Sequence, residues 1–506
     1  MADYLLGIDA GSTMTKVVLL DAAGRELGCE RRRNPILFPA PGHTERDPER
    51  MWNDVADATR ALLSNVGAAP EAVAAVAVSG YGAGLYLVDA AGRAVRPGIM
   101  STDARAGDVL ARWERDGVTQ RNALRIRQRL WAGQPPALMA WLGIYEPEVL
   151  ARTHCLLFCK DYLRARLCGE LATDPTDAGV GGLVAVPDDA HTDAFFEELG
   201  LAAWRNKMPR IAPATEMAGE LTGDAAEATG LRAGTPVVRG VVDVTASALA
   251  SGVREPTQMS VVAGTFSINS SLHRAPRIDG LPFLQMAYPL GGYCLATEGS
   301  ATSASNFEWY CKAMLGPEAA AAASAAGRSI YELAADRVAE SMNRPNDILF
   351  LPFLFGGPGG APAAFIGLQA AHDGADVVRA IFEGIVFAHK LDIDALLAGR
   401  DQAPVRTIRL VGGASRNAVW AQMFADMLGL PVEICEGTEP GARGTAMCAA
   451  VALGWHADLD AAMLAMVRVV QVHTPRPEWQ ERYARKFERF HRMTRMLAEF
   501  RTEDGV

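Results

Sequence analysis

The stretch that decides the fold is Gly7-Ile-Asp-Ala-Gly-Ser-Thr-Met-Thr-Lys16, which joins two short apolar runs. Runs of this length on either side of a glycine turn predict a β-hairpin. Asp9 comes directly after the apolar run of the first predicted strand, and Gly11, Ser12 and Thr13 form the turn. Glycine can adopt positive φ and leaves backbone N–H groups open, and the two hydroxyls add donors, so this turn is suited to an anion such as a phosphate.

Asp9 adds a second property to the turn, because a carboxylate repels a phosphate unless a cation lies between them. An aspartate beside a phosphate-binding turn therefore predicts Mg²⁺, held through water. The alternative is an ordinary β-turn in which the carboxylate of Asp9 accepts nearby backbone N–H groups.

The pattern around this hairpin predicts a mixed α/β domain. A third strand is expected after the hairpin, then a helix with apolar residues at helical spacing, then a buried strand that ends in Ser79-Gly80. The expected elements are strands over Tyr4–Ile8, Thr15–Leu20, Glu26–Cys29 and Val73–Val78, and a helix over Trp52–Leu63.

A second hairpin turn, Gly264-Thr265, follows Gly11-Ser12 by 253 positions, which is half the chain. It comes after the apolar run Gln258–Ala263. Each half also holds an apolar strand that runs into glycine, Val78–Gly80 in the first and Leu410–Gly413 in the second. This internal duplication predicts two related α/β domains that face each other across a cleft, where the two turns could hold a polyphosphate from both sides.

Asp243 is the candidate catalytic residue. It follows the apolar run Pro236–Val242 and precedes another, Ala246–Leu249, which places it at a strand-to-helix junction near the expected domain boundary at Ala246–Arg254. A carboxylate there would lie in the cleft and could accept a proton from a substrate hydroxyl. The alternative is that Asp243 caps the helix that follows, which is a common role of aspartate.

A glycine pair, Gly412-Gly413, precedes a helix expected over Trp420–Leu428. The pair would let a flat ring approach the backbone, and Ser415 and Asn417 could hydrogen-bond a base or a ribose. For one of these two polar residues, capping of the helix is the alternative.

Composition excludes several classes of protein. The chain has 506 residues, of which 49% are hydrophobic and 21% are charged, as in folded globular proteins. A formal net charge of −10 disfavours a nucleic-acid-binding surface or a polybasic membrane patch. No apolar stretch is long enough to span a membrane, and the start of the chain lacks the basic region of a signal peptide, so a cytoplasmic location is expected.

Familiar site motifs are missing from the sequence. The eight Cys form no Cys-x-x-Cys pair and the nine His show no zinc-ligand spacing, so reduced thiols and no structural metal are expected. There is no P-loop and no protein-kinase motif, and Gly80-Tyr-Gly-Ala-Gly84 lacks the third glycine of a dinucleotide-binding loop.

Taken in order, the motifs resemble those of the FGGY carbohydrate kinases, a branch of the actin/hexokinase/heat-shock-70 ATPase fold. The resemblance covers the chain from Gly7 to about Gly454. It rests on Gly7–Thr13, Glu45–Asp47, Thr102–Arg105, Lys160–Leu163, Ala172–Asp174, Gly240–Asp243, Ala263–Thr265, Gly412–Ser415 and Gly441–Ala446, among others. It implies an α/β fold of two duplicated actin-like (ribonuclease H-like) domains with a cleft between them, and transfer of phosphate from ATP to a sugar.

The resemblance also implies a role for each matching residue. Asp9 would hold Mg·ATP, and Asp243 would be the general base that activates the sugar hydroxyl. Lys16 would be a further phosphate contact, with a structural role as its alternative. The implied phosphate and nucleotide contacts are Gly11, Ser12, Thr13, Lys16, Gly264, Thr265, Gly412, Gly413 and Asn417.

The choice of sugar depends on several loops. Trp131–Pro136, Met100–Asp103 and Glu298–Ser303 resemble the L-xylulose/3-keto-L-gulonate kinases, whereas Ala172–Asp177 is closer to xylulose and erythritol kinases. Where the 3-keto-gulonate type carries Lys, this chain has Ala83, which argues against an anionic sugar acid. A neutral ketopentose such as xylulose or L-xylulose, phosphorylated on a terminal hydroxyl, is expected. The sugar contacts would be Tyr81, Gly82, Asp103 and Asp243.

The expected domains are an N-terminal sugar-binding domain over 1–247, a nucleotide-binding domain over 248–454, and a helical tail over 455–506 packed on the second domain. The apolar spacing from Trp479 to Leu497 predicts an amphipathic helix in this tail, with a partner-binding helix as the alternative. A homodimer is common in the family that the chain resembles. The alternatives in function are a kinase of erythritol, ribulose, glycerol or 3-keto-L-gulonate, a non-enzymatic nucleotide switch, and a sugar sensor without catalysis.

Overall fold

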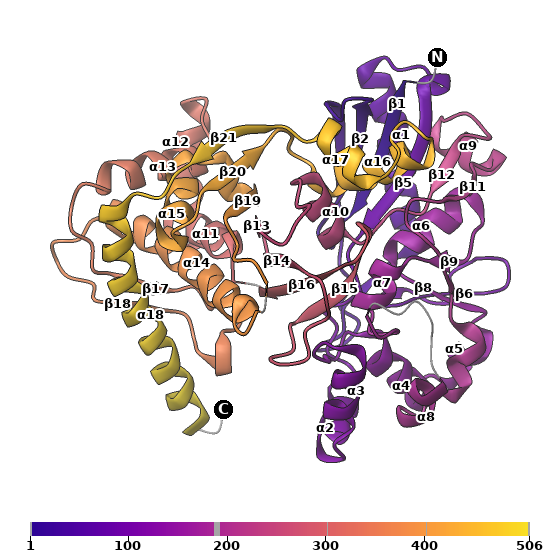
Figure 1. The fold of residues 1–506 in the computed structure, drawn as a ribbon, viewed down its shortest axis with the longest axis horizontal. Coiled ribbons are helices and arrows are strands. Elements are labelled where there is room, and N and C mark those ends of the chain that lie inside the picture. Colours follow the sequence, from indigo (N-terminus) through magenta and orange to yellow (C-terminus); the bar gives the residue numbers. More distant parts are fainter. Residues whose placement is uncertain (1–2, 187–192, 301, 401, 504–506) are drawn as a thin grey trace. The chain divides into compact units, whose positions relative to one another are not determined.

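A computed structural model describes residues 3–186, 193–300, 302–400 and 402–503. The chain forms two compact units, each assembled from separate segments (Figure 1). The first unit comprises Met1–Arg254, Leu272–Ala296 and Gly437–Arg468. The second comprises Glu255–Ser271, Thr297–Glu436 and Val469–Val506. The domains expected from the sequence were continuous segments with boundaries at residues 247 and 454. They differ from these two units and stay a prediction.

The first unit is built on a six-stranded sheet in the order β11-β12-β5-β1-β2-β3. Strands β1, β2 and β3 are antiparallel neighbours, whereas β5 is parallel to both β1 and β12. The strands are β1 (Tyr4–Ala10), β2 (Met14–Asp21), β3 (Glu26–Arg33), β5 (Val73–Gly80), β11 (Met217–Glu220) and β12 (Pro236–Val238). Helices α1, α6 and α16 pack on these strands, which explains why β1 and β5 are apolar along nearly their whole length. The hairpin and the strands expected at the start of the chain are confirmed.

The second large sheet has seven strands in the order β15-β16-β14-β13-β19-β20-β21, most of which belong to the second unit. Strand β13 is antiparallel to β14 and parallel to β19, β19 is parallel to β20, and the edge strand β21 is antiparallel to β20. The strands are β13 (Gln258–Ala263), β14 (Ser267–His273), β15 (Leu284–Tyr288), β16 (Tyr293–Ser300), β19 (Thr407–Gly412), β20 (Val432–Cys435) and β21 (Val469–His473). The turn of residues 264–266 between β13 and β14 is the expected second hairpin.

The two sheets repeat one arrangement. In each, the first strand of the hairpin lies beside a parallel strand that ends in glycine. Ala10 is opposite Gly80 in the first sheet, and Ala263 is opposite Gly412 in the second. The duplication predicted from the sequence is therefore confirmed at the level of strand pairing, and in each sheet the hairpin turn and a glycine-ended strand meet at the same edge.

Helices and short strand pairs complete both units. The short pairs are β4 (Glu45–Arg46) with β7 (Gly98–Ile99), β6 (Tyr86–Val88) with β8 (Cys155–Leu157), β9 (Ala172–Thr173) with β10 (Arg210–Ile211), and β17 (Leu349–Leu351) with β18 (Ala364–Ile366). The helices of the first unit are α1 (Pro48–Val66), α2 (Gly107–Arg115), α3 (Val118–Ile126), α4 (Pro135–Tyr145), α5 (Pro147–Arg152), α6 (Cys159–Cys168), α7 (Pro175–Val180), α8 (Asp193–Glu198), α9 (Gly223–Thr229), α10 (Asp243–Ala250), α16 (Pro440–Ala452) and α17 (Leu459–Met466). Those of the second are α11 (Ala304–Tyr310), α12 (Gly316–Ala325), α13 (Ile330–Ser341), α14 (Gly374–Leu397), α15 (Ala418–Leu428) and α18 (Pro477–Glu503).

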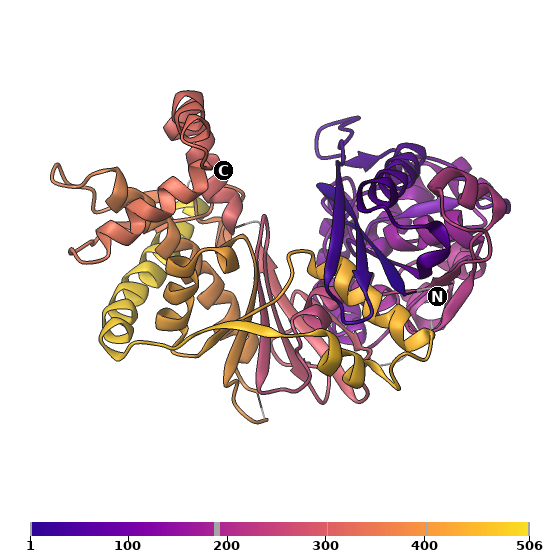
Figure 2. The same ribbon diagram turned by 90° about the horizontal axis from the view of Figure 1, so that it is seen from above.

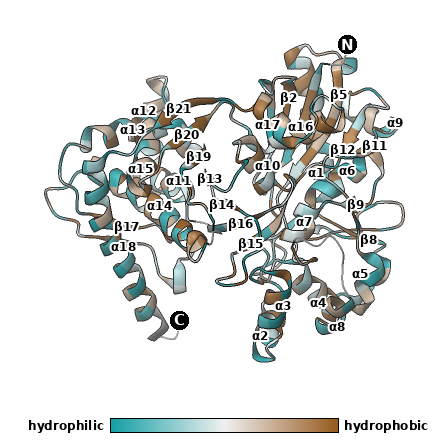
Figure 3. Cartoon of the chain, viewed as in Figure 1, coloured by the Kyte–Doolittle hydropathy of each residue, from teal (hydrophilic) through white to brown (hydrophobic). Residues whose placement is uncertain are grey.

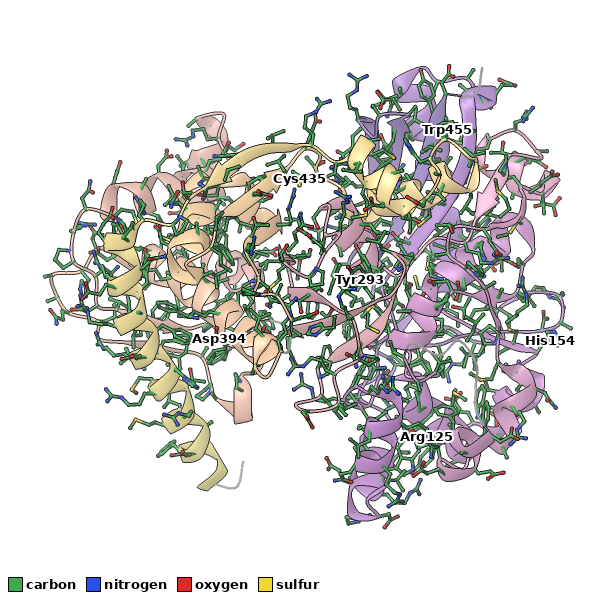
Figure 4. All side chains as sticks on the ribbon, in the orientation of Figure 1. Arg125, His154, Tyr293, Asp394, Cys435 and Trp455 are labelled. Carbon is green, nitrogen blue, oxygen red and sulfur yellow. The ribbon has the colours of Figure 1, made fainter. Side chains whose placement is uncertain are left out.

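Apolar side chains from distant segments form the core of the first unit. One cluster joins strands β1, β2 and β5 to α10, α16 and α17, and the partly buried Trp455, labelled in Figure 4, packs against it. Strands β2 and β5 of this unit are largely brown in Figure 3, as their apolar composition requires. Within the residues described, no helix has both the length and the hydropathy that crossing a membrane needs.

The helix predicted in the tail is α18, which packs on α14 and α15 of the second unit (Figures 1 and 2). Its apolar stripe is buried, with Tyr483 at 1% and Phe490 at 0% exposure. Lys486 forms a buried ion pair with Glu383 of α14. The amphipathic helix expected from the spacing is confirmed as a docked element.

Candidate active site

The first turn of the site joins β1 to β2. The carbonyl oxygen of Gly11 accepts hydrogen bonds from Asn34 Nδ2 at 2.7 Å and from the Arg46 guanidinium at 3.3 Å, which holds the turn from behind. Gly11 does not have positive φ, which corrects the reason given for it from the sequence. Glycine is needed because a Cβ would lie 2.9 Å from the carbonyl oxygen of Met14. Ser12 is half-buried and Thr13 is exposed.

Asp9 is the residue before the last of β1, close to the strand end where it was expected, and is buried, at 8% exposure. Burial raises the pKa of its carboxyl above the usual value, and the nearby Lys16 opposes this rise. The Lys16 ammonium lies 3.9 Å from Asp9 Oδ2 and 2.9 Å from Glu439 Oε2. Lys16 is therefore beside the turn, and in this structure its ammonium bridges the carboxylates of Asp9 and Glu439. This contact is what the alternative, a structural role for Lys16, predicts.

Helix α16 begins directly against Asp9. A Cβ on Gly441 would lie 2.4 Å from Asp9 Cγ, so only glycine lets the start of this helix approach the carboxylate. Glu26 holds the segment that leads into the helix by accepting the backbone N–H groups of Thr438 and Glu439 at 2.8 and 2.9 Å. The positive end of the helix thus lies next to a buried negative charge, which favours the ionised form of Asp9.

Asp243 is the first residue of α10 and follows a short strand, as predicted. The N-cap position is Val242 rather than Asp243, and the carboxylate accepts the N–H of the next residue, Val244, at 2.7 Å. Burial, joined by the charge of Asp9, raises the pKa of Asp243 to about 7. The two carboxylates are therefore electrostatic neighbours, and Asp243 is close to half-ionised at neutral pH.

The loop after β5 lies against the residue that precedes Asp243. A Cβ on Gly82 would be 2.6 Å from Val180 Cγ1 and 2.8 Å from Val242 Cγ2, so this loop needs glycine for close packing. Ala83 is fully buried, with φ of 59°. Tyr81 is buried in the core, and its hydroxyl is 2.8 Å from that of Tyr86. Among the expected sugar contacts, Gly82 is next to Asp243, whereas the Tyr81 phenol already has a partner.

The carboxylate of Asp103 accepts hydrogen bonds from its own loop, and its role as a sugar contact stays a prediction. Its oxygens accept the backbone N–H of Thr44 at 2.6 Å and the backbone N–H and guanidinium of Arg105 at 2.8 to 3.0 Å. Arg105 also donates to Glu45 at 2.7 Å. With 2% exposure and four donors, Asp103 holds its loop in place.

The second unit contains a cavity of about 720 Å³ beside the second turn. Thr265, Gly413 and Asn417, three of the predicted nucleotide contacts, line it. One wall is aromatic and was not predicted: Phe382 stacks on Trp420 with ring centroids 4.2 Å apart, and Phe307 meets both rings edge-on. A cavity with a flat apolar wall and hydroxyl and amide groups nearby has the chemistry that a nucleoside requires.

The glycine pair and Asn417 have structural roles as well. Gly412 has φ of 91°, and a Cβ there would lie 2.6 Å from the carbonyl oxygen of Ala263, so glycine is required where β19 meets β13. Asn417 caps α15, because its Oδ1 accepts the N–H groups of Val419 and Trp420 at 3.0 and 3.1 Å. The Ser415 hydroxyl donates to the Gly412 carbonyl at 2.8 Å.

Comparison with known proteins identifies the family. Residues 4–250 match the N-terminal domain of the FGGY family of carbohydrate kinases, and residues 259–453 match its C-terminal domain. The chain belongs to the FGGY family. It is therefore a carbohydrate kinase, an enzyme that transfers phosphate from ATP to a sugar.

Relatives along the full length support this assignment. The FGGY kinase is 32% identical over 505 residues to the L-xylulose/3-keto-L-gulonate kinase of Escherichia coli K12, covering 99% of this chain and 98% of that one. It is 30% identical over 479 residues to the erythritol kinase of Brucella abortus, covering 90% and 89%. Among solved structures, a xylulose kinase from Lactobacillus acidophilus superposes with a TM-score of 0.85 at 20% identity, covering 98% of each chain. These structures share the two-domain actin-like fold expected from the sequence.

The donor set of the FGGY kinase fits Mg²⁺ held mainly by phosphate and water. Among the described residues, no group of three or more His, Cys, Asp or Glu side chains could hold a metal ion. Asp9 supplies one buried carboxylate beside the phosphate turn. Magnesium commonly binds proteins through one or two carboxylates plus substrate phosphates, so these residues suit a cation that arrives with its nucleotide.

Proposed function

We propose that this kinase phosphorylates a neutral ketopentose, xylulose or L-xylulose, on a terminal hydroxyl, with Mg·ATP as the donor and Asp243 as general base. The observation that carries the proposal is the position and pKa of Asp243. Its carboxylate is at the start of α10, beside Asp9, and its pKa of about 7 matches the pH at which it would work. A base with a pKa near the working pH is both ionised and able to keep the proton it takes.

Each of the site residues in the first unit would have its own role in phosphate transfer. Asp243 would accept the proton as the sugar hydroxyl attacks the terminal phosphate. The N–H groups and hydroxyls of Gly11, Ser12 and Thr13 would bind phosphate oxygens, and Lys16 is within reach of the same turn. Asp9 would hold Mg²⁺ through water, and the ion would neutralise phosphate charge. Positioning and charge stabilisation of this kind supply most of the catalysis in phosphoryl transfer.

The second unit would bind the nucleoside of ATP. The cavity beside Thr265 has space for a purine nucleoside, and its aromatic wall suits a planar base. Gly264 and Thr265 would contact phosphate, and Gly412, Gly413 and Asn417 would lie along the nucleotide. The amide nitrogen of Asn417 stays open to a ligand, because its oxygen is the atom that caps α15.

A neutral sugar is favoured by Ala83. The side chain at this position is apolar and fully buried next to the Gly82 loop, so it offers no cation to a sugar carboxylate. The relatives named as L-xylulose and xylulose kinases support a ketopentose. A tetritol is the runner-up, supported by the erythritol kinase of Brucella abortus. The cytoplasmic location and the homodimer expected from the sequence stay predictions.

The test is release of ADP in the presence of single sugars. Purified protein with Mg·ATP is offered xylulose, L-xylulose, ribulose, erythritol, glycerol and 3-keto-L-gulonate in turn, and ADP is followed by a coupled assay. We expect the highest kcat/KM with one of the two xyluloses. A higher kcat/KM with a tetritol or with the sugar acid would overturn the ketopentose. ATP hydrolysis that no sugar accelerates would support a nucleotide switch, and sugar binding without ADP release would support a sensor.

A further inference from the structure

The backbone just before Asp243 is held at few points. Gly240 has φ of 74° and lies so close to β5 that a Cβ would be 2.1 Å from the carbonyl oxygen of Val78. Val242 forms a single bridge with Gly80 at the end of β5. Val242 is also the N-cap residue of α10, so its conformation sets the direction in which the first residue, Asp243, leaves the helix start.

Thr176, on the short helix α7, supplies a side-chain contact to this backbone. Its Oγ1 accepts the backbone N–H of Val242 at 3.0 Å, and Thr176 is 1% exposed. Without this hydroxyl the buried N–H would lose its acceptor, a costly state for a backbone donor. The contact therefore links α7 directly to the residue next to the proposed base.

Helix α7 is itself anchored by a buried ion cluster centred on Lys160 of α6. The Lys160 ammonium is 2.9 Å from Asp174, 3.3 Å from Asp177 and 2.5 Å from Asp161, and all four side chains are fully buried. Asp174 caps α7 by accepting the N–H of Thr176 at 2.9 Å. The cluster therefore holds Thr176 in place, and the Thr176 hydroxyl oxygen in turn accepts the backbone N–H of Val242.

Burial and the neighbouring charges shift the pKa values of Lys160 and Asp177 in this cluster. Burial opposes the charge of Lys160, yet the three aspartates raise its pKa above the usual value. Burial, despite Lys160, also holds the pKa of Asp177 well above its ordinary value.

We propose that Thr176 is a positioning residue for Asp243: its hydroxyl oxygen fixes Val242 and thereby aims the carboxylate at the sugar hydroxyl. The proposal rests on the proposed function, since it needs Asp243 to act as the base. A base displaced by a fraction of an ångström loses rate, while substrate binding is little affected.

The experiment compares Thr176→Val, which keeps the shape and loses the acceptor, with Thr176→Ser, which keeps the hydroxyl. We expect T176V to lower kcat by about 10- to 100-fold, with KM for sugar and for ATP within about threefold of wild type. T176S should recover most of the lost kcat. In T176V the Val242 amide should exchange with deuterium faster than in wild type, and in T176S it should not.

The matched control is Thr229→Val at the end of α9. Thr229 is also buried, at 1% exposure, and its hydroxyl oxygen also accepts a backbone N–H, that of Leu231 at 3.3 Å. Thr229 thus stabilises the local backbone as Thr176 does, but it does not contact the residues next to Asp243. We therefore expect T229V to lower Tm and to leave kcat unchanged. If T176V does not fold, Thr176→Ala replaces it with the same expectation.

Three outcomes would overturn the proposal. The first is a T176V enzyme with wild-type kcat, and the second is an unchanged Val242 exchange rate in that variant. The third is a fall in kcat that T176S does not reverse. Failure of the proposed function looks different, because the wild type itself would then release no ADP in response to sugar, and amide exchange would still decide whether Thr176 holds Val242.

Discussion

At the scale of single residues, Asp243 is half-buried, yet its carboxyl must be ionised for it to act as the general base. Replacing it by asparagine keeps the shape and removes the base. We expect Asp243→Asn to lower kcat by at least ~10²-fold, the usual effect of losing a general base. Steady-state kinetics with the best sugar measure this effect. A folded D243N protein with near-normal kcat would contradict the assignment.

The same substitution should stabilise the protein at alkaline pH. The pKa of Asp243 is raised from 3.8 to about 7, so its favourable contribution is complete below pH 3.8 and is lost as pH rises through 7. Above pH 7 the folded protein contains a half-buried carboxylate next to the charge of Asp9, which the amide does not reproduce. D243N should therefore have a higher Tm than wild type at pH 8, with a smaller difference at pH 5. Thermal unfolding at both pH values tests this, and an equal or lower Tm at pH 8 would contradict it.

The pKa of Asp243 also sets the pH dependence of activity. Because the base must be ionised, kcat/KM for the sugar should fall tenfold per pH unit well below about 7 and level off above it. Rates between pH 5 and 9 at saturating Mg·ATP measure this profile. The terminal phosphate of ATP titrates in a similar range, so the control is the residual rate of D243N, which keeps that titration and lacks the carboxylate. A flat wild-type profile through pH 7 would exclude Asp243 as the titrating base.

At the scale of elements, the start of α16 should be the most sensitive helix end in the first unit. Gly441→Ala would place a methyl group 2.4 Å from Asp9 Cγ, so either the helix or the carboxylate must move. We expect a loss of stability of about 1–3 kcal/mol and a higher KM for ATP. Denaturant unfolding and kinetics give the two quantities.

Gly143→Ala is the matched control for Gly441→Ala. Gly143 lies within α4, and a Cβ there would meet nothing within 4 Å. Alanine is the better helix former, so G143A should be neutral or slightly stabilising. If G441A behaved like G143A, the close approach of α16 to Asp9 would be unimportant.

Elements were predictable where the signal is local. Hairpins are marked by glycine turns between apolar runs, which is why the turns at Gly11 and Gly264 could be matched from the sequence alone. Helices α1 and α18 follow from apolar residues at helical spacing. The sequence did not reveal why residue 11 must be glycine. Close packing against Met14 requires it, rather than a positive φ.

Contacts between distant segments could not be read from the sequence. Glu439 binds Arg31 across 408 positions and also pairs with Lys16, and no local pattern marks such a pairing. Nothing in the sequence indicates that the guanidinium of Arg105, only two residues away, donates to both carboxylate oxygens of Asp103. The aromatic wall of the cavity beside Thr265 joins α11, α14 and α15, three helices from separate parts of the chain.

At the scale of the whole molecule, each compact unit has its own core and its own candidate ligand. We therefore expect calorimetry to resolve two unfolding transitions. A ligand stabilises the unit that binds it, by about 2.7 kcal/mol when its concentration is 100 times Kd. The ketopentose should raise the midpoint of one transition and ADP that of the other. A single transition that both ligands shift equally would show that the units unfold together.

The return of residues 437–468 to the first unit has a consequence for how the protein is made. Helix α16 covers β1 and β5, yet the ribosome synthesises Thr297–Glu436 before it reaches that helix. The nascent amino-terminal half therefore waits with an uncovered apolar sheet face until translation is nearly complete, which is the situation in which chains aggregate or recruit chaperones. Mutations that weaken α16 should lower the yield of soluble enzyme in cells more than they lower the stability of the finished protein.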